Sequence, residues 1–148
     1  MNNEWKKEFA RRIRRKMVAK HMNQRELARI AGIHEVTLSR YICCTRTPPI
    51  HIVCKLAIAL DCEFDYLVYG VPNCLYLESD ADERWQDNFI NNVIHRMQIL
   101  QMPRAYIARE TGLDYLTIYF YLKGVKTPSL PAAMRICKVF GCTLGELI

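Results

Sequence analysis

Hydrophobic residues recur at helical spacing through most of the chain, and no segment alternates in the manner of a strand. Near the N-terminus, Trp5, Phe9, Ile13 and Met17 stand at every fourth position, which places them on one face of a helix. The same kind of spacing returns in the segments that follow. The pattern predicts an all-α protein.

Four shorter helices are predicted after this first one. One runs from about 24 to 31 and stops at Gly32, because glycine readily adopts the left-handed conformation that ends a helix. The next runs from about 34 to 42, and the prolines within 47–49 then break the chain. The last two helices have apolar residues on one face: Ile52, Val53, Leu56, Ala57 and Leu60 in the fourth, and Phe64, Leu67 and Val68 in the fifth.

The second half of the chain repeats the first with an offset of 80 residues. The ungapped match pairs residues 5–68 with residues 85–148, and 13 of its 64 positions are identical, against roughly 4 expected from ordinary composition. A repeat with only two copies indicates duplicated domains rather than a solenoid. The second copy ends on Thr143-Leu-Gly-Glu146, a capping-box pattern that predicts the start of its last helix.

The predicted domains are residues 1–70 and residues 83–148, with a linker over residues 71–82. The segment between the copies starts with glycine and proline and ends with acidic residues, which is typical of a linker. It also contains an apolar run at 75–77 (Leu-Tyr-Leu). We expect this run to pack against one of the two domains.

All of the excess positive charge lies in the first half of the chain. The formal net charge is +6 and the isoelectric point is about 9.0, values that favour a polyanionic partner such as nucleic acid. Residues 1–74 hold 13 Lys/Arg and 7 Asp/Glu, whereas residues 75–148 hold 8 of each. The first domain is therefore the expected binding site for that partner.

No stretch is long and apolar enough to span a bilayer, and the charged N-terminus lacks the apolar run of a signal peptide. We therefore expect a cytoplasmic protein whose seven cysteines are thiols. The one close His/Cys pair, His51 and Cys54, lies in an apolar run where cysteine behaves as a small hydrophobe. Core packing is favoured over a metal site, and no cofactor is predicted.

No set of catalytic residues emerges from the sequence. None of the three serines lies in a G-x-S-x-G motif, and the chain has no P-loop and no H-E-x-x-H motif. The four histidines are scattered along the chain. We do not expect an enzyme.

Residues 23–42 (NQRELARIAGIHEVTLSRYI) have the layout of two short helices joined by a tight turn that contains glycine. Together with Arg46-Thr-Pro48 and Leu56-Ala-Ile-Ala-Leu60, this segment resembles the Cro and phage-repressor (XRE-type) helix-turn-helix family. The resemblance covers residues 5–70 and, more weakly, 85–148. It implies two tandem five-helix domains of the lambda-repressor type.

The resemblance also implies that the helix over 34–42 enters the major groove and that residues near its N-terminus contact base edges. Their chemistry suits that task, because Arg binds guanine bidentately, Glu accepts from cytosine and Val packs on a thymine methyl group. Residues flanking this helix are implied as phosphate contacts. The implied DNA-binding residues are Gln24, Arg25, His34, Glu35, Val36, Ser39, Arg40 and Arg46. The basic run 11–16 is either a further set of phosphate contacts or the solvated face of the first helix.

The second copy keeps the pattern of the fold but loses this chemistry. Its equivalent positions begin with Asp114, whose charge is repulsive beside phosphate, and continue with apolar and aromatic residues. Such a patch usually marks a protein contact, although some of its side chains are alternatively part of this domain's own core. The predicted dimer or protein contact residues are Tyr115, Leu116, Tyr119 and Phe120.

The two copies differ in the turn after the third helix. The second copy has glycine there, at Gly124, whereas the first has Cys43-Cys44. If Cys44 adopts the left-handed conformation, it is strained by about 1 kcal/mol or more.

Both copies also lack an ion pair that often joins the first and third helices of the family. Met17 and Ile42 replace it in the first copy, and Met97 and Leu122 replace it in the second. Exchanging both partners for apolar residues is tolerated at little cost. We expect each pair to be in contact and buried.

These features favour a sequence-specific transcriptional regulator of phage or bacterial type, most simply a repressor, that binds double-stranded DNA. It would bind through the first domain and form a homodimer largely through the second. The alternative is a protein-binding inhibitor built on the same fold, of an anti-defence or anti-CRISPR kind, that also regulates its own gene. The charge distribution favours DNA, whereas the aromatic residues of the second copy keep the alternative open.

Overall fold

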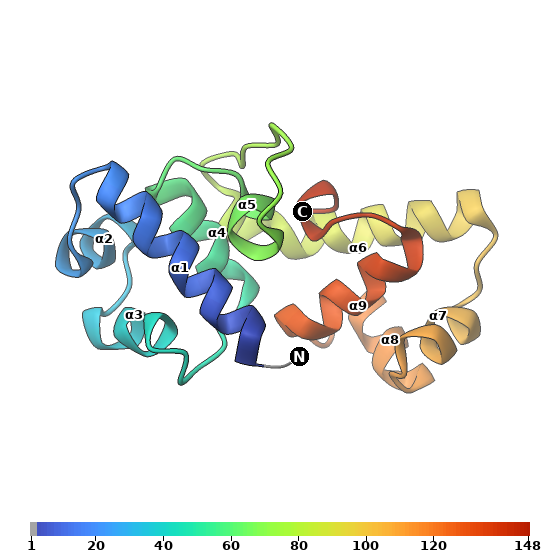
Figure 1. Ribbon diagram of the computed structural model, residues 1–148. Helices are drawn as coiled ribbons and strands as arrows, with labels where there is room; N and C mark the ends of the chain where they lie inside the picture. The colour runs from blue at the N-terminus through green and yellow to red at the C-terminus, as the bar shows by residue number, and fades with distance from the viewer. Residues whose placement is uncertain (1–2) are drawn as a thin grey trace. The chain divides into compact units, whose positions relative to one another are not determined.

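The computed structural model describes residues 3–148, which form nine α-helices and one 3-10 helix and contain no strand. The chain divides into two compact units, Met1–Asp82 and Glu83–Ile148. Each unit is a small group of helices wound around its own core (Figure 1). The prediction of an all-α protein is confirmed.

The first unit contains the five helices in the predicted order. They are α1 (Asn3–Ala19), α2 (Gln24–Ala31), α3 (Glu35–Ile42), α4 (Ile50–Ala59) and α5 (Phe64–Tyr69). α1 packs against α3 and α5, and α4 packs against α2 and α5 (Figure 1). The break before α4 falls at the expected prolines, because proline supplies no backbone N–H to continue a helix.

The core of this unit is built from the predicted apolar faces. Phe9, Ile13 and Met17 of α1 are buried. Trp5 stacks on Phe9 with ring centroids 5.4 Å apart, and its indole N–H donates to the Val68 carbonyl at 3.1 Å. This bond joins the start of α1 to the end of α5. The inward residues predicted for the last two helices are all buried: Ile52, Val53, Leu56, Ala57, Leu60, Phe64, Leu67 and Val68.

The second unit repeats this order with one difference at its end. Its elements are α6 (Ala81–Leu100, beginning just before the unit), α7 (Arg104–Thr111), α8 (Tyr115–Leu122), α9 (Leu130–Phe140) and the 3-10 helix η1 (Leu144–Glu146). The predicted capping box is present, and the Thr143 N–H donates to the Glu146 carboxylate at 2.6 Å. The element that it caps is a single 3-10 turn, whereas the corresponding element of the first unit is the helix α5. Glycine at position 145 disfavours a longer helix here.

The segment between the two units is held by polar contacts, and the prediction that its apolar run packs on a domain is wrong for two of three residues. Leu75 is 44% exposed and Tyr76 is 60% exposed, while Leu77 is half-buried. The segment is attached through Asn73 instead. Its backbone N–H donates to the Glu63 carboxylate at 2.8 Å, and its side-chain amide donates to the buried Asp65.

The buried cysteines of the first unit behave as core residues. Cys54 is fully buried, which confirms the interpretation of the apolar run, whereas its neighbour His51 is exposed. Burial raises the pKa of Cys54 to about 12 and that of Cys62 to about 11, so both thiols stay protonated at neutral pH. Within residues 3–148, no group of three or more His, Cys, Asp or Glu side chains is placed to hold a metal ion.

Candidate nucleic-acid interface

α2 and α3 form a compact helix-turn-helix. The Asn23 side chain caps α2 and accepts from the Glu26 N–H at 2.8 Å. α2 ends at Gly32, whose φ of +70° lies in the left-handed region that glycine adopts without strain. The N-cap of α3 is His34, whose side chain makes no capping bond. The turn between the helices is therefore short, and α3 packs directly against α2.

α3 has one buried face and one exposed face. Leu38, Tyr41 and Ile42 are buried at 4% exposure or less and hold the helix on the core. The opposite face of the helix points outward, and Val36 on it is 60% exposed. The outward set contains the residues that the resemblance implies as base contacts, exposed except for the half-buried Ser39: His34, Glu35, Val36, Ser39 and Arg40.

The implied phosphate contacts lie on the elements that flank α3. Gln24 and Arg25 occupy the first turn of α2, where Gln24 is half-buried and Arg25 is exposed. Arg46 is exposed in the loop between α3 and α4. Neither of these arginines, nor Arg40 on α3, forms an ion pair with a carboxylate within residues 3–148. All three guanidinium groups are available to an external anion.

The basic run of α1 has a role that the sequence did not indicate. The Arg12 guanidinium donates to the carbonyls of Leu67 and Val68 at 3.1 and 3.2 Å, and Arg14 donates to the Ile42 carbonyl at 3.2 Å. Both side chains therefore cap the C-terminal ends of other helices, where positive charge is favourable.

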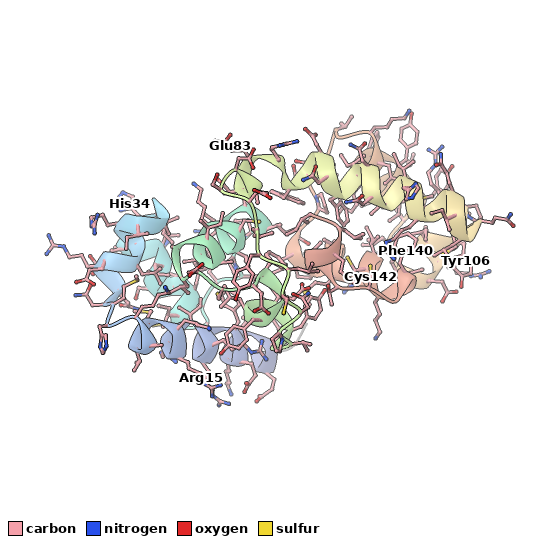
Figure 2. The ribbon with its side chains drawn as sticks, turned by 90° about the horizontal axis from the view of Figure 1, so that it is seen from above. Arg15, His34, Glu83, Tyr106, Phe140 and Cys142 are labelled. Atoms are coloured by element: carbon pink, nitrogen blue, oxygen red, sulfur yellow. The ribbon has the colours of Figure 1, made fainter. Side chains whose placement is uncertain are left out.

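The remaining cations of this run follow no single pattern. Lys16 lies 4.8 Å from the centre of the Tyr66 ring, and Arg11 pairs with Glu8 at 2.7 Å. Arg15 is exposed and extends from α1 on a different side of the domain from His34 (Figure 2). Several members of the run are thus intramolecular contacts, which neither of the two sequence-based alternatives had proposed.

The turn after α3 is strained, as expected. Cys44 has a φ of +63°, in the region where a residue with a Cβ atom is disfavoured. Its backbone N–H donates to the Tyr41 carbonyl at 3.2 Å, and the Thr45 N–H donates to the Arg40 carbonyl at 3.0 Å. These bonds close the C-terminal end of α3, and Arg46 is the next residue after Thr45. In the second unit, Gly124 adopts the same conformation with φ of +74°.

The equivalent surface of α8 is apolar and exposed. Tyr115 is 49% exposed, Leu116 60% and Phe120 36%, so these three side chains lie outside the core of the domain. Tyr119 is half-buried, and its ring contacts Phe120 edge-on with centroids 5.6 Å apart. Asp114 is the N-cap of α8, and its side chain accepts hydrogen bonds from the Leu116 and Thr117 N–H groups at 2.9 and 3.2 Å.

The two apolar pairs that replace the ion pair differ in burial. Met17 and Ile42 are buried at 8% and 4% exposure where α1 packs on α3. Met97 and Leu122 are only half-buried, so the prediction of burial is wrong for this second pair. Both residues of this second pair line an open cavity of the domain instead.

A capped helix, a glycine turn and a second helix with an outward polar face define a helix-turn-helix DNA-binding domain. Residues 12–67 match the family model for helix-turn-helix domains, and residues 92–148 match the model for the Cro/C1-type helix-turn-helix DNA-binding domain. The chain consists of two tandem helix-turn-helix domains of the XRE type and belongs to that family. Neither the curated proteins nor the solved structures contain a match to it.

These domains identify the chain as a DNA-binding regulator. Domains of this kind are typical of regulators that carry out no catalysis themselves. Among the described residues, 3–148, no helix combines the length and the apolar character needed to cross a membrane.

Proposed function

We propose that this protein is a sequence-specific transcriptional repressor of phage or bacterial type, and that its first domain (residues 1–70) reads double-stranded DNA. The observation that carries the proposal is the exposed face of α3, which presents Glu35, Arg40 and their neighbours to solvent. Neither of these charged side chains has an ion-pair partner within residues 3–148. Charged groups held on a rigid helix without a partner are suited to recognition of an external ligand.

The chemistry of this face matches the major groove. Arg40 is proposed to bind guanine O6 and N7, Glu35 to accept from the cytosine amino group, and Val36 to contact a thymine methyl group. His34 and Ser39 complete the contacts to base edges as adaptable hydrogen-bonding groups. A helix that presents a cation, a carboxylate and an apolar side chain on one face distinguishes base pairs by their donors and acceptors as well as by their shape.

The backbone contacts are proposed to come from Gln24, Arg25 and Arg46. Gln24 and Arg25 lie in the first turn of α2, where the partial positive charge of the helix end favours phosphate. Arg46 follows α3 by four residues. The charge excess of the first half of the chain supports the same placement.

A gel-shift assay on the duplex from upstream of the gene that encodes this chain tests the proposal directly. We expect retention of that duplex, with a scrambled duplex of the same length bound far more weakly. The logarithm of the association constant should fall linearly with the logarithm of salt concentration, because phosphate contacts release counterions. Equal binding to both duplexes, or none to either, would contradict sequence-specific recognition.

The second domain is proposed to form a homodimer through Tyr115, Leu116, Tyr119 and Phe120. A single helix-turn-helix reads only a few base pairs, and repressors of this type gain affinity by spacing two reading helices about 34–36 Å apart. The exposed residues of α8 supply no cation for a phosphate or a base edge, but they are of the kind that a second chain covers.

Analytical ultracentrifugation at tens of micromolar tests the dimer. Leu116→Glu should dissociate it, because the new charge would have to be buried in the contact. Val36→Glu is the matched control, since Val36 occupies the equivalent position on α3 and has the same 60% exposure. A natural chain that is monomeric at this concentration and still binds a palindromic duplex tightly would overturn the dimer.

A further inference from the structure

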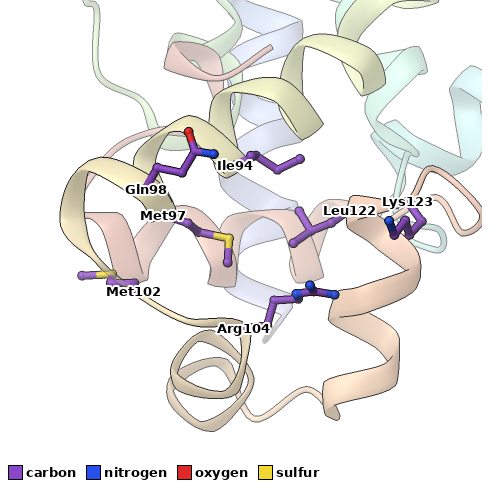
Figure 3. Close-up of a pocket in the computed structure, with 7 residues that line it drawn as sticks. All are labelled: Ile94, Met97, Gln98, Met102, Arg104, Leu122 and Lys123. Atoms are coloured by element: carbon purple, nitrogen blue, oxygen red, sulfur yellow. The ribbon is translucent and has the colours of Figure 1, made fainter.

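The second domain contains a cavity of about 320 Å³ beside the N-terminal end of α7. Its apolar wall comes from α6, the following turn and α8, and consists of Ile94, Met97, Met102 and Leu122. Figure 3 shows Met97 and Leu122 extending into the same space, with the Arg104 side chain next to them. The volume is at the lower end of the range of about 300–1,000 Å³ that is usual for small-molecule sites.

The cavity lies where the first domain has a contact that is missing here. In the first domain, Arg14 extends from α1 to the carbonyl of Ile42 at the end of α3, at 3.2 Å. The position equivalent to Arg14 is Ile94, whose side chain has no donor for the carbonyl of Leu122. The facing pair Met97 and Leu122 is left half-buried around open space.

Two cations complete the lining of this apolar space. Arg104 is half-buried and Lys123 is exposed, and both line the cavity. Each lies over the ring of Tyr119, at 5.2 Å for the guanidinium carbon and 5.6 Å for the ammonium nitrogen. Neither forms an ion pair with a carboxylate within residues 3–148. One aromatic ring therefore gathers two uncompensated positive charges beside an apolar wall.

We propose that this cavity binds a small amphipathic anion, with a flexible apolar chain against Ile94, Met97, Met102 and Leu122 and an anionic head group between Arg104 and Lys123. The wall is aliphatic and includes two methionines, whose flexible thioether chains adapt to a ligand of irregular shape. The two cations attract the head group through charge-assisted hydrogen bonds. The site belongs to the second domain alone and is independent of DNA recognition by α3.

The test uses the full chain with methyl-labelled methionine, titrated with decanoate and with decanol as the neutral probe of the same chain length. Met97 and Met102 report on the cavity, and their counterparts Met17 and Met22 report on the first domain. We expect saturable shifts of the Met97 and Met102 methyl signals only. Decanoate should bind at least about tenfold more tightly than decanol, since the head group meets two cations.

The double variant Arg104→Gln/Lys123→Gln should abolish this preference and leave decanol binding unchanged. Arg109→Gln/Lys126→Gln removes the same charge from exposed positions outside the cavity lining and serves as the control. Decanol binding as tightly as decanoate, or equal shifts at all four methionines, would overturn the proposal. So would a preference for decanoate over decanol that survives unchanged in Arg104→Gln/Lys123→Gln, because the head group would then not meet these two cations.

Discussion

Residues 31–40 of the first domain and residues 111–120 of the second follow the same order of buried, half-buried and exposed side chains, position by position. Val36 and Leu116 are each 60% exposed, and Leu38 and Ile118 are both almost fully buried. What differs is the chemistry at the exposed positions, which on α3 includes the charged Glu35 and Arg40 but on α8 is apolar and aromatic throughout. Duplication has kept the packing and changed the surface, because packing restrains only the residues that are packed.

The contacts of the first helix in each domain show the same division. Arg12 and its counterpart Asn92 both donate to the carbonyl of the equivalent leucine, Leu67 at 3.1 Å and Leu147 at 2.9 Å. Different side chains thus satisfy the same orphan carbonyl at the end of a helix. The match of the second domain to a DNA-binding family model is consistent with this conservation of architecture. It carries no information on which exposed residues meet a base.

The largest expected effect concerns the reading face itself. Arg40→Ala should weaken binding to the recognised duplex by about 1–3 kcal/mol and relax the preference at one base pair, since a bidentate contact to guanine is lost. Phe120→Ala, at the equivalent position of the second domain, should leave base preference unchanged. Fluorescence anisotropy on a set of single-substituted duplexes measures both. A change of base preference with Phe120→Ala but not with Arg40→Ala would reverse the assignment of the two domains.

The turn after the third helix offers a reciprocal test of stability. Cys44→Gly should raise the free energy of unfolding of the first domain by about 1 kcal/mol, because glycine adopts the left-handed conformation without strain. Gly124→Ala should lower that of the second domain by a similar amount. A Cβ atom at Gly124 would meet Ile90 at 3.7 Å, an ordinary contact, so the loss would come from the backbone alone. Urea unfolding, followed at Trp5 in one domain and Trp85 in the other, distinguishes the two.

If both substitutions destabilise, Cys44 is held in place by contacts that outweigh its backbone strain. The candidate side-chain contact is weak, because the Cys44 sulfur is 3.8 Å from the Ile42 carbonyl oxygen. We therefore expect the relief of backbone strain to outweigh the lost side-chain contact, so that Cys44→Gly stabilises the first domain.

Much of this fold was predictable from the sequence because its signals are local. Helical spacing located α1, glycine ended α2 at Gly32, and prolines separated α3 from α4. The strain at Cys44 followed from the repeat, since the aligned residue in the other copy is glycine. Each of these inferences depends on residues that are neighbours in the chain or on the comparison of the two copies. None of them requires knowledge of contacts between distant residues.

The features that were missed depend on contacts between distant parts of the chain. Arg12 and Arg14 looked like solvated or phosphate-binding cations, because nothing in the local sequence shows that a helix end lies within their reach. Met97 and Leu122 looked buried by analogy with the first copy, whereas they line a cavity in a domain where Ile94 stands in place of Arg14. For the site, the sequence placed the residues on elements but could not show which cations are left unpaired.

A smaller effect is expected from the contact that closes the first domain. Arg14→Ile should lower the free energy of unfolding reported by Trp5 by about 0.5–1 kcal/mol, since one part-buried hydrogen bond to the Ile42 carbonyl is lost. Arg15→Ile removes a neighbouring exposed arginine with no such bond and should change little. If the two variants unfold alike, the hydrogen bond from Arg14 to the Ile42 carbonyl does not stabilise the first domain.

The smallest effect is expected at the start of α8 and depends on pH. A hydrogen bond from the Thr117 hydroxyl, followed by backbone hydrogen bonds from Thr117 and Leu116, holds the pKa of Asp114 below its ordinary value of 3.8. A carboxylate whose pKa is lowered by folding stabilises the folded state above the unfolded pKa and loses that contribution as pH falls through the folded pKa. Asp114→Ala should therefore destabilise the second domain at neutral pH, and its difference from the natural chain should shrink below pH 3.8.

The first domain supplies the control for this cap. His34 stands at the equivalent position of α3 and makes no side-chain capping bond, so His34→Ala should leave the unfolding reported by Trp5 unchanged. Asp114→Asn should behave as an intermediate, because asparagine caps helices through its oxygen but does not titrate. Urea unfolding at a series of pH values, followed at Trp85, measures the difference. Asp114→Ala lowers the free energy of unfolding by some amount at neutral pH. If this loss stays the same below pH 3.8, the ionised carboxylate does not stabilise the cap.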